Sequence, residues 1–205
     1  MKRFLALFCA LFMISSFAFA DDDMDKDESE SSKNVTTTIQ YNEPGDQYIK
    51  IGLMVSMPLN FGGSFPLFRD GNLSTGGAGT LGYHRFVSNW VSWGFDVHFG
   101  YHPTIGENIF TYIPLVLTAT VQPTYNRFEF PITLGVGAAM ENYLNRTYFP
   151  GLIIKPQAGV FFRATPSWSF GLEGDFTYMP QWYSDSEKND YGLFGSFVLS
   201  ARYHF

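Results

Sequence analysis

Hydrophobic and polar residues alternate with a period of two along most of this chain, which is the pattern of β-strands with two different faces. The alternation is cleanest over residues 91–101, 128–140, 168–178 and 191–205. In these segments one face carries aromatic, aliphatic and glycine residues without any charge. The charged residues and histidines in or next to these segments lie on the other face: Asp96, His98, His102, Glu129, Glu141, Glu173, Asp175, Arg202 and His204.

Four further segments, 47–59, 75–86, 109–122 and 152–164, alternate more weakly. The glycine-rich segment 75–86 does not reveal its faces, and we expect a β-bulge there. The connections alternate in length: residues 87–90, 123–127 and 165–167 form short turns, whereas residues 60–74, 103–108, 142–150 and 180–190 form longer polar loops. The sequence therefore predicts an all-β fold, a closed antiparallel up-and-down transmembrane β-barrel of eight strands.

Alternation alone also fits a soluble barrel or sandwich, in which the apolar face points inward. Three features favour a membrane barrel. The polar face is rich in glycine, serine and threonine rather than in the charges of a water-exposed surface. Several segments are longer than the ~9–11 residues that a tilted strand needs to cross a bilayer. Aromatic residues, 19% of the chain, gather near the ends of the segments, as they do in the two interfacial girdles of membrane barrels.

The first 20 residues have the pattern of a secretory signal peptide, with an N-terminal membrane anchor as the alternative. Lys2 and Arg3 precede a short apolar run, and Ala18-Phe19-Ala20 supplies small residues for cleavage. Residues 21–33 hold seven acidic residues against two lysines, so we expect residues 21–45 to form a disordered acidic leader. Residues 46–205 then form the barrel, which we expect in the cell outer membrane with both termini in the periplasm.

The net charge of −6 lies mostly on the leader, and the remainder of the mature chain offers no basic field for nucleic acid. In a membrane barrel the polar faces point into the lumen, where charged groups must pair to be tolerated. Five acids and four bases nearly balance, which favours mutual pairing over a charged permeation path. In particular, we expect Arg163 and Arg202 to contact inward acids. The predicted polar network of the lumen comprises Lys50, Asp96, Glu129, Glu141, Lys155, Arg163, Glu173, Asp175 and Arg202.

The chain ends on a phenylalanine that is preceded by apolar or aromatic residues at every second position: Phe197, Leu199, Ala201, Tyr203 and Phe205. This ending resembles the C-terminal strand of bacterial outer-membrane proteins. Together with the eight strands, the chain resembles the small outer-membrane barrels of the OmpA, OmpX, OmpW and opacity-protein type. The resemblance implies that the barrel assembly machinery reads the terminal strand and that outer-membrane lipid surrounds the barrel. It transfers no further functional residue.

Catalysis and metal binding are not expected from the sequence. His98 and His102 share a face but lie ~13 Å apart along an extended strand, too far to share a metal ion. Acyl hydrolases with this architecture carry a His-x-Ser motif, which none of the histidines here provides. We therefore expect no cofactor and a structural or surface-interaction role. The alternative is a narrow channel or conduit for small molecules, hydrophobic ones included, in which Phe110 and Tyr112 line an apolar pocket near the outer mouth.

Overall fold

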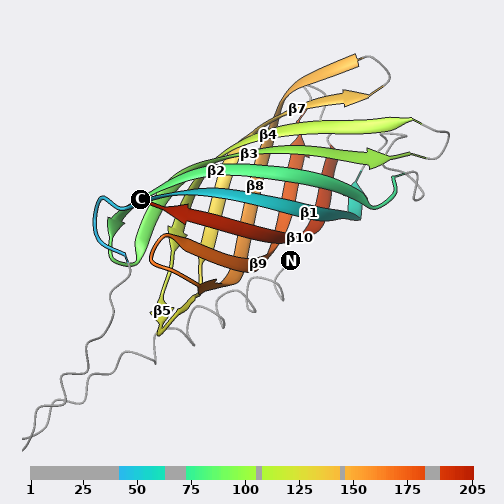
Figure 1. Cartoon of the computed structure of the whole chain (residues 1–205). Coiled ribbons are helices and arrows are strands. Elements are labelled where there is room, and N and C mark those ends of the chain that lie inside the picture. Colours follow the sequence, from blue (N-terminus) through green and yellow to red (C-terminus); the bar gives the residue numbers. More distant parts are fainter. Residues whose placement is uncertain (1–41, 63–72, 105–107, 144–145, 183–189) are drawn as a thin grey trace, which may run out of the picture. The chain divides into compact units, whose positions relative to one another are not determined.

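The chain folds into antiparallel β-structure (Figure 1). The computed structural model describes residues 42–62, 73–104, 108–143, 146–182 and 190–205, so the predicted signal peptide and nearly all of the predicted leader lie outside the described residues. Two short strands, β5 (Thr124–Tyr125) and β6 (Phe128–Glu129), lie between β4 and β7. The long strands are β1 (Gln47–Gly62), β2 (Gly76–Ser88), β3 (Val91–Pro103), β4 (Ile109–Val121), β7 (Ile132–Tyr143), β8 (Arg146–Arg163), β9 (Trp168–Gln181) and β10 (Asp190–His204).

The eight long strands close into a barrel. Each pairs antiparallel with the long strand that precedes or follows it in the chain, and β1 pairs with β10. Figure 1 shows the resulting order, from β7 through β4, β3, β2, β1 and β10 to β9, with β8 behind. At the end where the first strand begins, Gln47 and Phe205 exchange backbone hydrogen bonds of 3.1 and 3.0 Å. The predicted closed, eight-stranded, up-and-down architecture is confirmed. In the part of the chain that the structure describes, no helix is long and apolar enough to cross a membrane.

The segment 128–140, predicted as one strand, is divided into β6 and β7. The break falls at Pro131, which has no N–H to donate to the ladder, although its carbonyl accepts a hydrogen bond of 3.0 Å from the Gly159 amide. The register with β8 is the same on both sides of the break. The two pieces therefore act as a single wall strand with one missing donor.

The prediction of a loop over residues 142–150 is wrong. β7 continues to Tyr143 and β8 begins at Arg146, and these two residues are Cα partners. The segment Thr147-Tyr148-Phe149 has high β-propensity, which favours continuation of the ladder over a loop. The register shifts between Ala139 and Glu141, so an irregularity separates the added pairs from those of the barrel wall.

The faces of β2, which the sequence left open, are resolved. Its even-numbered residues point inward, including the buried Thr80 and His84, and its odd-numbered residues, such as Leu81 and Tyr83, are exposed on the outside. A register shift against β3 occurs at the end of the strand, between Phe86 and Ser88. All eight strands thus place one apolar face outward and one mixed face inward.

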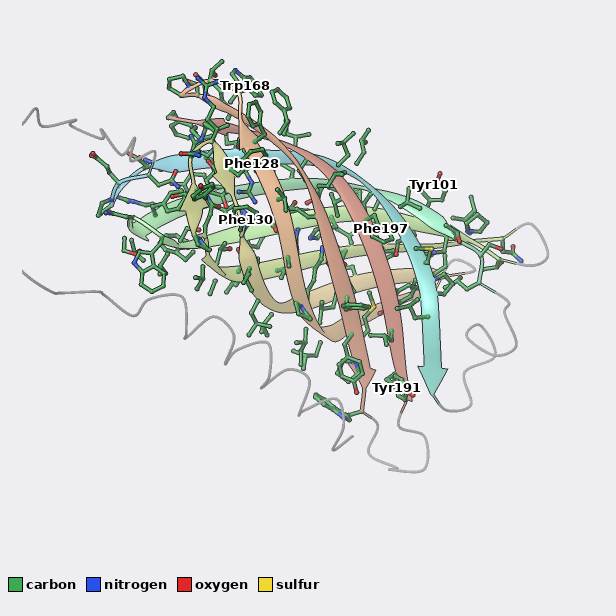
Figure 2. The ribbon with its side chains drawn as sticks, turned by 90° about the horizontal axis from the view of Figure 1, so that it is seen from below. Tyr101, Phe128, Phe130, Trp168, Tyr191 and Phe197 are labelled. Atoms are coloured by element: carbon green, nitrogen blue, oxygen red, sulfur yellow. The ribbon has the colours of Figure 1, made fainter. Side chains whose placement is uncertain are left out.

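The outer surface of the barrel is apolar. Leu53 on β1 and Leu172 on β9 are 72% and 65% exposed, and outward aliphatic or aromatic side chains continue around every long strand. Aromatic residues concentrate at the two ends: Figure 2 shows Phe128, Phe130 and Trp168 at one end and Tyr101 and Tyr191 at the other. An exposed apolar band with aromatic girdles is the surface of a membrane barrel, so the soluble alternative, with its apolar face inward, is wrong.

Inward glycines make room for the larger side chains of the lumen. A Cβ on Gly94 would collide with the imidazole of His84, its Cα partner on β2. A Cβ on Gly82 would likewise collide with the Asp96 carboxylate. The small residues of the polar face are therefore a packing requirement of the buried polar groups beside them.

We expect Gly94→Ala to destabilise the barrel by about 1–3 kcal/mol, because the added methyl must displace the His84 ring in a filled interior. Gly79→Ala is the matched control, since a Cβ there meets nothing closer than the Gly52 carbonyl oxygen at 4.0 Å. Urea unfolding of both variants in the same detergent gives the two free energies. Equal stability of the two variants would contradict the packing argument.

Candidate functional site

The lumen contains a connected network of buried charges at the end of the barrel where β1 begins and β10 ends. The Nε atom of Arg163 donates to Glu129 over 2.6 Å. Arg202 binds Glu173 at 3.2 Å and lies 3.7 Å from Glu129, so Glu129 joins the two guanidinium groups. Gln122 donates to Glu129 and accepts from Arg202 at 2.9 Å. Gln122 directly follows β4 and the other side chains come from β6, β8, β9 and β10, so the contacts cross the barrel interior from wall to wall.

A second set of contacts extends the network along the lumen. Lys50 on β1 binds Asp96 on β3 at 2.9 Å, and Asp96 also binds His84 at 2.9 Å. Lys50 lies 3.9 Å from Glu173, which connects this set to Arg202. Ser200 donates a hydrogen bond of 2.8 Å to the same Glu173 carboxylate. Each acid in this chain of contacts thus has at least one cation beside it.

Two aromatic rings and one residue before β1 complete the packing of the network. The Arg202 guanidinium carbon lies 3.4 Å from the centroid of the Phe161 ring and 4.9 Å from that of the Tyr48 ring. Such stacking stabilises a cation that has left water. Asn42, which the sequence assigns to the leader, is buried and accepts a hydrogen bond of 2.7 Å from Arg163. We call this whole assembly the ionic seal.

A smaller charged group lies farther along the lumen. Lys155 on β8 binds Asp175 on β9 at 3.2 Å and His98 on β3 at 3.3 Å. Glu141 is also buried, and its Cα partner is Tyr112 on β4. The structure therefore places all nine residues of the predicted lumen network inside the barrel. It divides most of them between the ionic seal and the Lys155 group.

The opposite end of the lumen is filled by apolar side chains. Tyr112 lies at the centre, with ring centroids 5.9 Å from Phe110, 6.0 Å from Phe194 and 5.7 Å from His102. Phe110 and Tyr112 thus point inward, packed against other side chains. We call this set the outer cap; its buried apolar residues are Leu73, Phe110, Tyr112, Val116, Ala139, Ile153, Met179 and Phe194.

Sequence reasoning missed several members of the ionic seal. Gln122, just after β4, and Phe161 on β8 lie at inward positions, but an uncharged residue there gives no signal of its own. His84 could not be assigned because the faces of its glycine-rich strand were unknown. Asn42 precedes the first alternating segment, so no periodicity indicated that it enters the lumen. The register of β2 with β3 brings His84 to Asp96, and the closed barrel brings Gln122 to Arg202 and Asn42 to Arg163.

The terminal-strand residues lie on the outside of the barrel. Phe197, Leu199, Tyr203 and Phe205 are exposed, and Ala201 is partly so. The rings of Tyr203 and Phe205 lie 6.1 Å apart, and Tyr203 also packs against Trp168 on β9 at 5.1 Å. The phenylalanine ending is therefore part of an aromatic patch on the apolar surface. Within the described ranges, three or more potential metal ligands do not gather at any point.

Comparison with known proteins shows the family to which the chain belongs. A protein-family model matches residues 25–203. An uncharacterized protein of Treponema pallidum (strain Nichols) is 30% identical over 202 residues, which is 92% of this chain and 90% of that protein. The chain belongs to the same family as this Treponema pallidum protein. A second uncharacterized protein of the same organism is 31% identical over 109 residues, 49% of this chain and 37% of its own length.

Solved structures show the same fold at low sequence identity. The outer membrane protein OprG of Pseudomonas aeruginosa has a TM-score of 0.56 and 11% identity, covering 82% of this chain and 99% of that one. Neisserial surface protein A, NspA, has a TM-score of 0.55 and 12% identity, covering 78% and 97%. The resemblance to small eight-stranded outer-membrane barrels is therefore confirmed. This family member has the fold of outer-membrane barrels, with buried ion pairs at one end of its interior and an apolar cluster at the other.

Proposed function

We propose that the protein is a non-catalytic outer-membrane barrel with a structural or surface-interaction role and without an open pore. The observation that carries this proposal is the ionic seal. Its buried ion pairs link Arg163 to Glu129, Arg202 to Glu173, and Lys50 to Asp96. From β10, Arg202 also reaches across the lumen to Gln122 at 2.9 Å and Glu129 at 3.7 Å. Eight strands enclose an interior that side chains just fill. The charged groups of the ionic seal are paired with one another, so they do not offer a permeating ion a row of free charges to follow.

The orientation follows from the two ends of the barrel. Short connections, including residues 89–90 between β2 and β3 and 164–167 between β8 and β9, lie at the end where Gln47 meets Phe205. At the other end the gaps in the chain between strands are longer: 13 residues separate β1 from β2, and eight separate β9 from β10. In outer-membrane barrels the short turns face the periplasm. Both termini of the barrel domain are therefore periplasmic in this proposal, and the outer cap faces the outside of the cell.

Among the described residues, Ser169 and His204 have the geometry of a nucleophile and its base. The Ser169 hydroxyl and His204 Nε2 lie 2.9 Å apart. Ser169 is completely buried, and it is the Cα partner of both Arg163 on β8 and Arg202 on β10. A nucleophile must meet its substrate, and a serine enclosed by packed strands does not present its oxygen to one. We interpret this pair as a structural hydrogen bond that supports the absence of catalysis in the proposed role.

Purified full-length mature protein in planar lipid bilayers is expected to show no steady single-channel conductance, because the ionic seal spans the lumen. The matched comparison is the same protein carrying Arg202→Ala and Glu173→Ala, which removes one ion pair from the seal together with the Arg202 contact to the Phe161 ring. Single-channel openings of the variant, with no conductance of the wild-type protein, support the proposal. Steady conductance of the wild type contradicts it.

A conduit for small molecules is the second candidate, favoured by a gap in the barrel wall. Pairing between β8 and β9 includes Ile154↔Tyr178 and resumes only at Gln157↔Asp175. The gap falls at Pro156, which cannot donate to the ladder. A weakened seam beside the apolar outer cap supports passage sideways between lumen and membrane. A disulfide between cysteines at positions 154 and 178 would lock the seam, and the conduit role requires that oxidation abolish any measured flux and that reduction restore it.

A further inference from the structure

The outer cap has one component that does not belong to the barrel wall. Of its eight buried apolar residues, seven lie on strands and the eighth, Leu73, lies in the short segment that leads into β2. Leu73 is only 5% exposed, whereas Ser74 and Thr75 beside it are exposed. The segment thus lays one apolar side chain into the mouth of the barrel and turns its polar ones to the outside. We call residues 73–75 the strap.

Few interactions hold the strap in place. Leu73 forms an isolated bridge with Thr104, and the Ser74 amide donates a hydrogen bond of 2.9 Å to the Pro103 carbonyl. The Ser74 carbonyl lies 2.9 Å from Nδ1 of His102. The neighbouring wall strands β1 and β2, in contrast, share ten consecutive Cα pairs. Segments with few contacts open locally at a lower free energy than the ladders they rest on.

His102 joins the strap to the rest of the cap. Because a carbonyl oxygen only accepts, Nδ1 carries the hydrogen of this contact and donates it to Ser74. The same ring packs against Tyr112 and, at 5.0 Å between centroids, against Phe194. The imidazole therefore binds the strap through a ring nitrogen and packs against the aromatic rings of Tyr112 and Phe194. Replacing the imidazole with a phenyl ring should remove the hydrogen bond to Ser74 and loosen the strap, while the packing against Tyr112 and Phe194 is kept.

We propose that the strap is a plug: it is the removable part of the outer cap and closes the mouth of the lumen by seating Leu73 between the wall residues. This inference goes beyond the proposed function, because it concerns access from the outer end and holds whether or not the barrel conducts. When the strap leaves, Phe110, Tyr112 and Phe194 face the outside while the ionic seal, at the other end, stays closed.

Thiol labelling tests the proposal, since Cys9 is the only cysteine in the sequence and lies in the predicted signal peptide. The reporter is Ala139→Cys, a small change at a completely buried cap position on β7. In liposomes, a small neutral thiol reagent added outside should modify this cysteine slowly. Adding Leu73→Ser should accelerate the reaction about tenfold or more, which corresponds to about 1.4 kcal/mol in the free energy of opening. His102→Phe should act in the same direction.

Thr75→Ala is the matched control, because it changes an exposed side chain of the same strap. It should leave the labelling rate unchanged. Resistance of each folded variant to proteolysis shows that the barrel itself is intact, and His102→Phe serves if Leu73→Ser fails to fold. The proposal is overturned if the reporter already reacts as fast as a free thiol, if neither release variant changes the rate, or if Thr75→Ala accelerates it equally.

Discussion

Replacement of Arg202 by methionine is expected to lower the free energy of unfolding by about 3–5 kcal/mol, since it leaves buried acids without their cation. Arg202 is 1% exposed and contacts both Glu173 and Glu129. Methionine keeps most of the volume between the Phe161 and Tyr48 rings, so the loss measures charge rather than a cavity. Urea titration of the barrel in lipid or detergent, followed by tryptophan fluorescence, gives the free energy.

Arg85→Met is the matched control, because Arg85 has the same side chain but lies exposed on the outer face of β2. Its replacement should change stability by no more than about 0.5 kcal/mol. Combining Arg202→Met with Glu173→Gln should lower the free energy of unfolding by less than the sum of the single changes. In the double variant both members of this ion pair are neutral, so neither is left as a buried charge without its partner. If Arg202→Met is no more costly than Arg85→Met, the ionic seal does not stabilise the fold.

The outline of the barrel could be predicted because one local rule, the period of two, governs every wall strand. Phe95 and Leu199 had to lie on the same side of the sheet as their neighbours two residues away, and both are exposed on the outside. That rule fails where its signal is absent. In β2, glycines occupy positions of both faces, and at 142–150 polar and proline residues resemble a loop although the backbone continues its ladder.

The partners within the lumen could be predicted only as a set. Alternation shows that Arg163 and Arg202 point inward, and the need to pair buried charge indicates that acids meet them. Which acid meets which base depends on the stagger of strands far apart in the sequence. Arg163 and Asn42, for example, are separated by 121 residues, and only the closed register brings them to 2.7 Å. The alternation placed Phe110 and Tyr112 of the outer cap inward, but Leu73 was missed because it reaches the cap from outside the strands.

Replacement of Phe205 by alanine should reduce the amount of barrel in the outer membrane far more than it reduces the stability of the folded barrel. The side chain is 56% exposed on the outer face, so losing it removes at most about 1.5–3 kcal/mol of apolar burial. The backbone of residue 205 keeps both hydrogen bonds to Gln47, and the closed ladder has no free edge from which to unravel. The terminal aromatic residue resembles the signal that the barrel assembly machinery reads, so its loss acts before folding.

Phe170→Ala separates the two effects, because Phe170 is a similarly exposed aromatic residue on the outer face of β9 but lies outside the terminal strand. Refolding into detergent should give nearly the same yield and stability for both variants. In cells, Phe205→Ala should accumulate in the periplasm and be degraded, whereas Phe170→Ala should reach the membrane. A variant at 205 that folds poorly in detergent yet reaches the membrane normally would show that the residue serves stability alone. If both variants behave alike in cells, the terminal strand is not read through its last residue.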